Sequence, residues 1–109
     1  MSFNAIILAA GQGKRMHSDL PKVAHEVMGR PMVLHVVDAI FEAAPDANVC
    51  VVVGHGRETV KELFSDINVS FAIQEQQLGT GHAVAQALNS DWGKKINSKP
   101  ILVLSGDTP

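Results

Sequence analysis

Four short apolar segments recur along the chain, and polar or amphipathic stretches separate them. They span residues 3–9, 48–54, 69–74 and 100–107 and are nearly continuous in apolar character. Strands of a parallel sheet covered on both faces have this character, because neither of their sides meets water. The pattern therefore predicts four buried parallel strands.

The stretches between these strands have helical periodicity. Residues 30–44 place apolar side chains three and four positions apart, and Pro31 is expected in the first turn, where its missing N–H costs no hydrogen bond. Residues 56–66 and 79–92 repeat the periodicity. Alternating strands and helices predict βαβ units with right-handed crossovers, and hence a doubly wound, mostly parallel α/β sheet of Rossmann-like type.

In such sheets, ligands bind outside the carboxyl ends of the strands. Three of the four predicted strand ends carry polar groups suited to a nucleotide or a metal. The four ends are Ala10-Gly11, Gly54-His55, Gln74-Glu75 and Gly106-Asp107. We therefore expect a binding site along this edge of the sheet.

Composition limits the kind of partner. With 109 residues, of which 46% are hydrophobic and 18% charged, the chain has the composition of one globular domain at most. Its net charge of −2 gives no basic footprint for nucleic acid. Any anion must then be bound by a local site. The chain stops two residues after Asp107, where a loop would begin, so we expect it to be part of a longer protein.

Cysteine and histidine give no sign of a zinc site. The single cysteine, Cys50, excludes an internal disulfide, and its apolar surroundings predict a buried thiol. The histidines show no metal-ligand spacing and are interpreted as packing or supporting groups; they are His17, His25, His35, His55 and His82. No apolar run approaches the ~20 residues that cross a bilayer, and no signal peptide is evident, so a cytoplasmic protein is expected.

The first strand runs into a glycine turn followed by two cations, in the sequence ILAAGQGKRM. A dinucleotide-binding fingerprint would need a third glycine where Met16 stands. A P-loop would need glycine at Leu8, and serine or threonine at Arg15. Neither familiar phosphate-binding motif is therefore present, and the missing third glycine disfavours a Rossmann oxidoreductase.

The same turn still has the elements of an anion site. Backbone N–H groups in a glycine turn form an anion-binding concavity, and Lys14, Arg15 and Lys22 add positive charge within nine residues. Pro21 limits where the Lys22 side chain can reach. This arrangement suits a triphosphate, although a solvated charged turn would have the same residues.

Several motifs resemble one family. LAAGQGKRM followed by SDLPKV resembles the signature L-A-A-G-x-G-T-R-M…P-K of sugar-1-phosphate nucleotidyltransferases. PKVAHEVMGRPMVLHVVDA, VVVGHG and QEQQLGTGHAV are more similar still to the uridylyltransferase domain of bifunctional bacterial enzymes that make UDP-N-acetylglucosamine. The resemblance covers residues 5–107. It implies that residues 1–109 form the N-terminal portion of that domain. The rest of the domain and a left-handed β-helix acetyltransferase domain would lie outside this chain.

The resemblance also implies roles for the first loop and Lys22. Arg15 would contact the leaving phosphates, and Lys22 would steady the region of the α-phosphate as charge moves during transfer. The residues that would wrap the nucleotide closely through small side chains and exposed amides are Leu8, Ala9, Ala10, Gly11 and Gly13. Lys14 stands where the family usually has threonine, which adds charge near the phosphates.

Further roles are implied at the later strand ends. Gln74 matches the residue that contacts the uracil edge, because an amide offers both donor and acceptor. Gly79 and Thr80 match a pair that also contacts the base, whereas no direct role is assigned to Gln77. Asp107 matches the family's Mg²⁺ ligand.

Two neighbours of Asp107 complete the implied site. Ser105 and Gly106 would line the same corner. Ser105 stands where tyrosine is common, which removes an aromatic wall and leaves the contact on the sugar side open.

The implied reaction is attack by N-acetylglucosamine-1-phosphate on the α-phosphorus of UTP with Mg²⁺, which gives pyrophosphate and UDP-N-acetylglucosamine, a cell-wall precursor. The parent would also acetylate glucosamine-1-phosphate and form a homotrimer through its C-terminal domain, whereas the 109-residue chain alone is expected to turn over little substrate. Two alternatives stay open at this point. They are uridylyl transfer to another sugar-1-phosphate and a nucleotide-binding module without catalysis.

Overall fold

The computed structural model describes residues 3–10, 26–54, 57–76, 78–96 and 100–106. The strands of this part are β1 (Asn4–Ala9), β2 (Glu26–Val27), β3 (Arg30–Pro31), β4 (Asn48–Val53), β5 (Ser70–Ile73) and β6 (Ile101–Ser105). The helices are α1 (Met32–Ala43), α2 (Arg57–Leu63), α3 (Thr80–Asn89) and α4 (Asp91–Lys95). No described helix has the length and apolar character needed to span a membrane.

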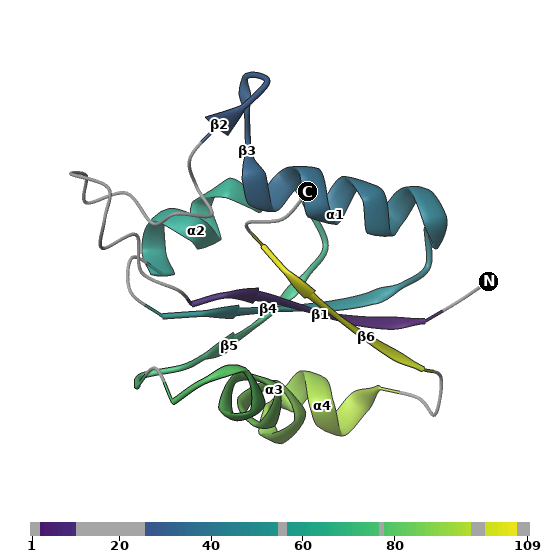
Figure 1. The fold of residues 1–109 in the computed structure, drawn as a ribbon. Helices are drawn as coiled ribbons and strands as arrows, with labels where there is room; N and C mark the ends of the chain where they lie inside the picture. Colours follow the sequence, from purple (N-terminus) through teal and green to yellow (C-terminus); the bar gives the residue numbers. More distant parts are fainter. Residues whose placement is uncertain (1–2, 11–25, 55–56, 77, 97–99, 107–109) are drawn as a thin grey trace.

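Four strands form one parallel sheet in the order β5-β4-β1-β6. Helices α1 and α2 cover one face of this sheet, and α3 and α4 cover the other (Figure 1). The doubly wound, mostly parallel α/β architecture predicted from the apolar segments is therefore confirmed. All four strands were located, each within two residues of its predicted ends.

Alternation along the central strands explains why both faces are buried. In β1, Ala5 and Ile7 belong to the core cluster on the side of α1 and α2, whereas Ile6 belongs to the cluster on the side of α3. In β4, Val51 and Val52 divide between the two clusters in the same way. Successive side chains of a strand point to opposite faces, which explains why both strands are apolar at every position after their first asparagine.

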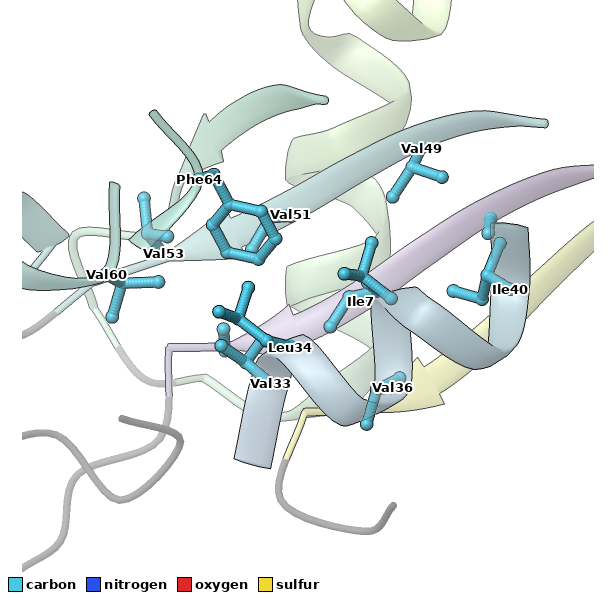
Figure 2. Close-up of a cluster of buried hydrophobic side chains, with 13 residues drawn as sticks. Ile7, Val33, Leu34, Val36, Ile40, Val49, Val51, Val53, Val60 and Phe64 are labelled. Carbon is cyan, nitrogen blue, oxygen red and sulfur yellow. The ribbon is translucent and has the colours of Figure 1, made fainter. Parts of the chain in front are cut away.

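The larger cluster fills the space between the sheet and α1 and α2 (Figure 2). Val33 and Ile40 of α1 and Val60 of α2 are almost completely buried within it. Burying a side chain of this size contributes about 1.5–3 kcal/mol. At one end of this cluster, the rings of Phe64 and Phe71 meet edge to face with centroids 5.8 Å apart.

A small hairpin that the apolar pattern did not predict precedes α1. Strands β2 and β3 pair antiparallel, and their two-residue turn has positive φ at both Met28 (57°) and Gly29 (78°). Such a turn usually shows asparagine or aspartate at its first position. Methionine there gave no turn signal, and the strands are too short for an alternating pattern.

Polar contacts hold this hairpin against α1. Arg30 forms two hydrogen bonds with the carboxylate of Asp38, at 2.9 and 3.1 Å. His35 donates from Nε2 to the carbonyl of Val27, since a carbonyl can only accept. Helix α1 begins at Met32, so Pro31 lies directly before the first turn that was predicted to contain it.

The predicted helix over 79–92 is wrong in one respect, because it is two helices. Helix α3 ends at Asn89, and Ser90 has extended backbone and caps α4 through a hydrogen bond from the Gly93 N–H. Serine is a favoured N-cap residue, since its hydroxyl accepts from an amide that the helix leaves unpaired. The break directs Trp92 into the core cluster beneath the sheet.

Candidate functional site at the carboxyl edge of the sheet

The carboxyl ends of all four parallel strands lie along one edge of the sheet. In spatial order, the residues that follow or end the strands are Gln74, Gly54, Ala10 and Gly106. Neighbouring strands are about 4.8 Å apart, so about 14 Å separate the first of these strands from the last. This edge is long enough to accommodate an extended nucleotide.

Three of these strand ends are packed closely together. A Cβ atom on Gly54 would lie 2.9 Å from the carbonyl oxygen of Gln74 and 3.2 Å from Cβ of Ala10. The amide of Gln74 donates to the carbonyl of Val53 at 2.8 Å, which extends the β4–β5 pairing beyond the last residue of β5. Glycine at position 54 therefore lets the ends of β1, β4 and β5 approach one another.

The ends of β1 and β6 are joined in a similar way. Ser105 pairs with Leu8 in the parallel register, and the amide of Gly106 donates to the carbonyl of Leu8 at 2.9 Å. Ser105 and Gly106, which were predicted to line the site beside Asp107, thus lie next to Leu8, the first residue predicted to wrap the nucleotide. Ser105 is exposed and Gly106 is buried.

The side chains that precede the loop are packed inside the protein. Ala9 is fully buried in the cluster under α1, Ala10 is buried on the opposite face, and Leu8 packs against the cluster of α3 and α4. A ligand beside residues 8–10 would therefore meet chiefly their backbone atoms, as the small side chains suggested.

Gln74 is one of two polar residues counted among the buried residues of the described chain, and its exposed fraction is 5%. Its side-chain nitrogen Nε2 lies 3.3 Å from the carbonyl oxygen of Gly79 and 2.9 Å from Nδ1 of His82. A buried amide is stable only when it is hydrogen-bonded. These contacts hold the Gln74 side chain between the sheet edge and the first turn of α3.

The start of α3 is exposed next to this amide. Gly79 has φ of +98° and ψ of 176°, a conformation that is essentially restricted to glycine. Its carbonyl also accepts from the amide of Ala83 at 3.1 Å. Thr80, the first helical residue, is exposed, and the first amides of a helix have no partner within it. The structure thus brings Gln74, Gly79 and Thr80 together.

The remaining predicted site residues lie outside the described residues. They are Gly11, Gly13, Arg15, Lys22 and Asp107. Among the described residues, no three His, Cys, Asp or Glu side chains gather in a way that could hold a metal ion. The donor chemistry nevertheless fits a hard cation, because Asp107 follows Gly106 in the sequence and carboxylate oxygen is a preferred ligand of Mg²⁺.

Three residues of this edge had no specific role in the sequence analysis. Gly54 was recognised as a strand end but not as a point of close approach. His82 was interpreted as a supporting group, and Gln86 was not considered. In the structure, Nε2 of Gln86 lies 3.1 Å from Nε2 of His82. Their spacing of four residues on one helix places them on the same face, which was the available signal.

A concave surface lies at the amino edge of the sheet. It has a volume of about 580 Å³ and is lined by residues that include Asn48, Ser70, Asp91 and Trp92. Asn48 and Ser70 begin β4 and β5, so this surface is at the opposite end of the strands from Gln74. It contains none of the residues to which the sequence assigned a role.

Cys50 is buried in β4, as expected from its apolar neighbours. Burial disfavours the thiolate and raises the pKa of Cys50 to about 12, an effect that a hydrogen bond with Ser90 partly offsets. The thiol is therefore a core group and not a nucleophile at neutral pH.

Comparison with known proteins agrees with the fold and the motifs. The model of the MobA-like NTP transferase domain matches residues 5–109. The chain belongs to this family of nucleotidyltransferase domains.

Curated relatives show which members of the family the chain is similar to. The chain is 53% identical over 109 residues to the bifunctional protein GlmU of Syntrophomonas wolfei, which covers 100% of this chain and 23% of that protein. It is 55% identical over 106 residues to GlmU of Cupriavidus pinatubonensis, covering 97% of this chain and 22% of that protein. The resemblance inferred from the motifs is confirmed, and the chain spans less than a quarter of these relatives.

Solved structures share the fold at lower identity. HddC from Yersinia pseudotuberculosis, solved with GMP-PN, has a TM-score of 0.77 and 23% identity, covering 96% of this chain and 48% of that one. A nucleotidyl transferase from Methanothermobacter thermautotroptrophicus has a TM-score of 0.79 and 23% identity, and the match covers 98% of this chain and 51% of that one. These likenesses support the nucleotidyltransferase fold.

Proposed function

We propose that this chain is the N-terminal portion of a uridylyltransferase domain, and that the full-length protein makes UDP-N-acetylglucosamine. UTP and N-acetylglucosamine-1-phosphate are the substrates and pyrophosphate is the second product. The observation that carries this proposal is the buried amide of Gln74, held at the carboxyl edge beside Gly79 and the exposed Thr80. The 53–55% identity to GlmU proteins supports it.

Base recognition is assigned to the β5 end of the edge. Uracil has an N–H donor on its pairing edge, so the Gln74 amide can accept from it through Oε1. Gly79 and Thr80 add backbone and hydroxyl groups beside the base. The shared fold does not dictate the base, since one structural relative was solved with GMP-PN and another is titled an inositol-1-phosphate CTP transferase.

Phosphate binding is assigned to the first loop and to the β6 end. The amides of Gly11 and Gly13 would hold phosphate oxygens, while Arg15 and Lys22 offset the charge that develops on the pyrophosphate. Asp107, which follows Ser105 and Gly106 in the sequence, would hold Mg²⁺, which when bound neutralises phosphate charge.

The chemical step requires no nucleophilic side chain. A phosphate oxygen of the sugar-1-phosphate forms a bond to the α-phosphorus of UTP as the bond from that phosphorus to the bridging oxygen breaks, and the bond electrons leave with pyrophosphate. The chain's residues position the reactants in line and stabilise the departing charge.

The resemblance to these bifunctional enzymes leads to further proposals for the whole protein. We infer that the rest of the transferase domain completes the metal and sugar sites, so residues 1–109 alone release little or no pyrophosphate. A separate left-handed β-helix domain would carry glucosamine-1-phosphate acetyltransferase activity and form the trimer. Measurable steady-state synthesis by the 109-residue chain would contradict the first of these proposals.

The test uses the full-length protein with UTP, Mg²⁺ and a panel of sugar-1-phosphates, with pyrophosphate as the readout. Release that is fastest with N-acetylglucosamine-1-phosphate supports the proposal. Preference for glucose-1-phosphate would overturn the assignment of the sugar, and no release with any sugar would favour a nucleotide-binding module without catalysis.

A further inference from the structure

The imidazole of His82 lies between two glutamine side chains at the start of α3. Its Nδ1 is 2.9 Å from Nε2 of Gln74, and its Nε2 is 3.1 Å from Nε2 of Gln86. Nε2 of Gln74 also reaches the carbonyl oxygen of Gly79 at 3.3 Å. A continuous series of hydrogen bonds therefore runs from the buried amide at the sheet edge into α3.

The Gly79 carbonyl determines which way the Gln74 amide faces. A carbonyl oxygen only accepts, so the end of the amide next to it must be the donating nitrogen. Reversing the amide would put the Gln74 oxygen Oε1 against the Gly79 oxygen, two acceptors without a hydrogen between them. The second hydrogen of the same nitrogen points to Nδ1 of His82, which must therefore accept.

An accepting Nδ1 fixes the rest of the series. In neutral imidazole one ring nitrogen accepts and the other carries the hydrogen, so Nε2 of His82 is the donor. Gln86 satisfies this donor when its amide oxygen is turned toward the ring. The two ends of an amide are nearly alike in size, and this orientation changes no packing. Gln74 thus donates to His82, and His82 donates to Gln86.

We propose that His82 is a positioning residue that holds the Gln74 amide so that Oε1, and not Nε2, is offered to the base. This rests on the proposed function, in which Gln74 contacts the nucleotide. Uracil carries hydrogen on N3 and can donate to Oε1. Cytosine N3 has a lone pair instead and would face Oε1 as a second acceptor, which costs binding. His82 thereby sets a preference for uridine over cytidine nucleotides.

Without an acceptor at the position of Nδ1, only the longer hydrogen bond to the Gly79 carbonyl, at 3.3 Å, holds the Gln74 amide in this orientation, so the amide turns more readily. Its nitrogen could then donate to cytosine N3, and discrimination between the bases would fall. The effect should appear in the ratio of the affinities for UTP and CTP, whereas simple destabilisation of the fold would weaken both nucleotides alike.

The test measures equilibrium binding of UTP and CTP to the full-length protein and its variants. His82→Leu removes the acceptor and should lower the UTP-to-CTP affinity ratio about five- to tenfold, the size of one hydrogen bond. His82→Asn keeps a carbonyl oxygen near the position of Nδ1 and should retain most of the ratio. His82→Gln, a polar control whose amide reaches the position of Nε2 instead, should behave like His82→Leu.

A second readout needs no nucleotide. Nitrogen-15 NMR of the unliganded protein should show His82 with hydrogen on Nε2 and a lone pair on Nδ1 when the ring is neutral. The opposite tautomer would overturn the proposal even if every variant bound nucleotide well. Near-ultraviolet circular dichroism of each variant checks that it is folded.

The outcomes separate this proposal from the proposed function. An unchanged affinity ratio in folded His82→Leu, in a protein that releases pyrophosphate from UTP, overturns the role of His82 alone. A ratio that falls as expected, in a protein that releases no pyrophosphate with any sugar-1-phosphate, supports the role of His82 and overturns the transferase activity. Binding of neither nucleotide by the wild-type protein overturns both.

Discussion

A side chain on Gly54 would collide with the backbone of Gln74, because its Cβ would lie 2.9 Å from the Gln74 carbonyl oxygen. Real Cβ atoms almost never come this close to an oxygen, and Cβ of Ala10 stands 3.2 Å away on another side. The approach of β1, β4 and β5 at their carboxyl ends thus depends on a glycine. This relationship connects the packing of the sheet to the geometry of the candidate site.

We expect Gly54→Ala to lower the free energy of unfolding by about 1–3 kcal/mol, since the neighbouring atoms are backbone or core and cannot move aside cheaply. It should also weaken UTP binding, because Gln74 must shift. Urea denaturation monitored by the fluorescence of Trp92 measures the first effect. Gly81→Ala is the matched control, since its Cβ would have no neighbour within 4 Å. Equal stability of Gly54→Ala and the wild type would contradict the close approach.

Gly79 gives a second prediction, which separates the fold from the ligand. At φ of +98°, alanine is strained by about 1–3 kcal/mol, so Gly79→Ala should reduce both stability and UTP affinity. Thr80→Ala, one residue on, should leave stability nearly unchanged and weaken only nucleotide binding. Thermal unfolding and calorimetric titration together distinguish them. A Gly79→Ala protein as stable as the wild type would be inconsistent with the backbone conformation described.

The Arg30–Asp38 salt bridge should contribute little to the free energy of unfolding. Its side chains are 44% and 52% exposed, and exposed pairs are worth about 0.2–1 kcal/mol even with two hydrogen bonds. Asp38→Asn should therefore cost no more than this at low salt. The difference should shrink in about 1 M salt, where the screening length is about 3 Å. Asp46→Asn, which has no salt bridge with any described residue, serves as the control. A loss of stability several times larger in Asp38→Asn would contradict this assignment of the pair as a weak surface contact.

Cys50 predicts a loss of stability at alkaline pH. The folded pKa is about 12 and the unfolded pKa is 9.0, so the unfolded state releases its proton first as pH rises. Stability should be unaffected by this group below about pH 9 and fall by about 1.4 kcal/mol per unit above it, until the folded pKa is reached. The chain contains no tyrosine to titrate in the same range.

Cys50→Ala provides the comparison for this prediction. The difference between the unfolding free energies of the two proteins should change with pH only above about 9. The native thiol should also resist a disulfide reagent at pH 8 and react after unfolding. Rapid modification of the native protein would contradict the burial of the thiol.

The sheet was predictable from the sequence because its strands are apolar on both sides. β1 and β4 contain buried residues at successive positions, which only a strand covered twice requires. The carboxyl-edge location of Gln74 followed from that parallel arrangement. The division of α3 from α4 at Ser90 was missed because apolar periodicity continues through Trp92, and a single N-cap serine is a weaker signal than the periodicity.

The contacts of the site were less predictable than its location. The order of the strands in the sheet, β5-β4-β1-β6, decides which strand ends lie next to one another. The apolar pattern of the sequence does not predict this order. The link between Gln74 and His82 joins two elements eight residues apart through a turn whose path depends on Gly79. Histidine on the first turn of a helix is common for other reasons, so only the observed 2.9 Å contact distinguishes it.

The central claim, uridylyl transfer at the carboxyl edge, is tested most directly by the rate of pyrophosphate release from UTP and N-acetylglucosamine-1-phosphate. The full-length wild-type protein should release pyrophosphate in step with UDP-N-acetylglucosamine. Gln74→Leu should lower kcat/KM for UTP at least about tenfold through the lost base contact. Asp91→Asn, on the concave surface at the amino edge, should change nothing. Absence of pyrophosphate with the wild type, or full activity in a folded Gln74→Leu protein, would contradict the claim.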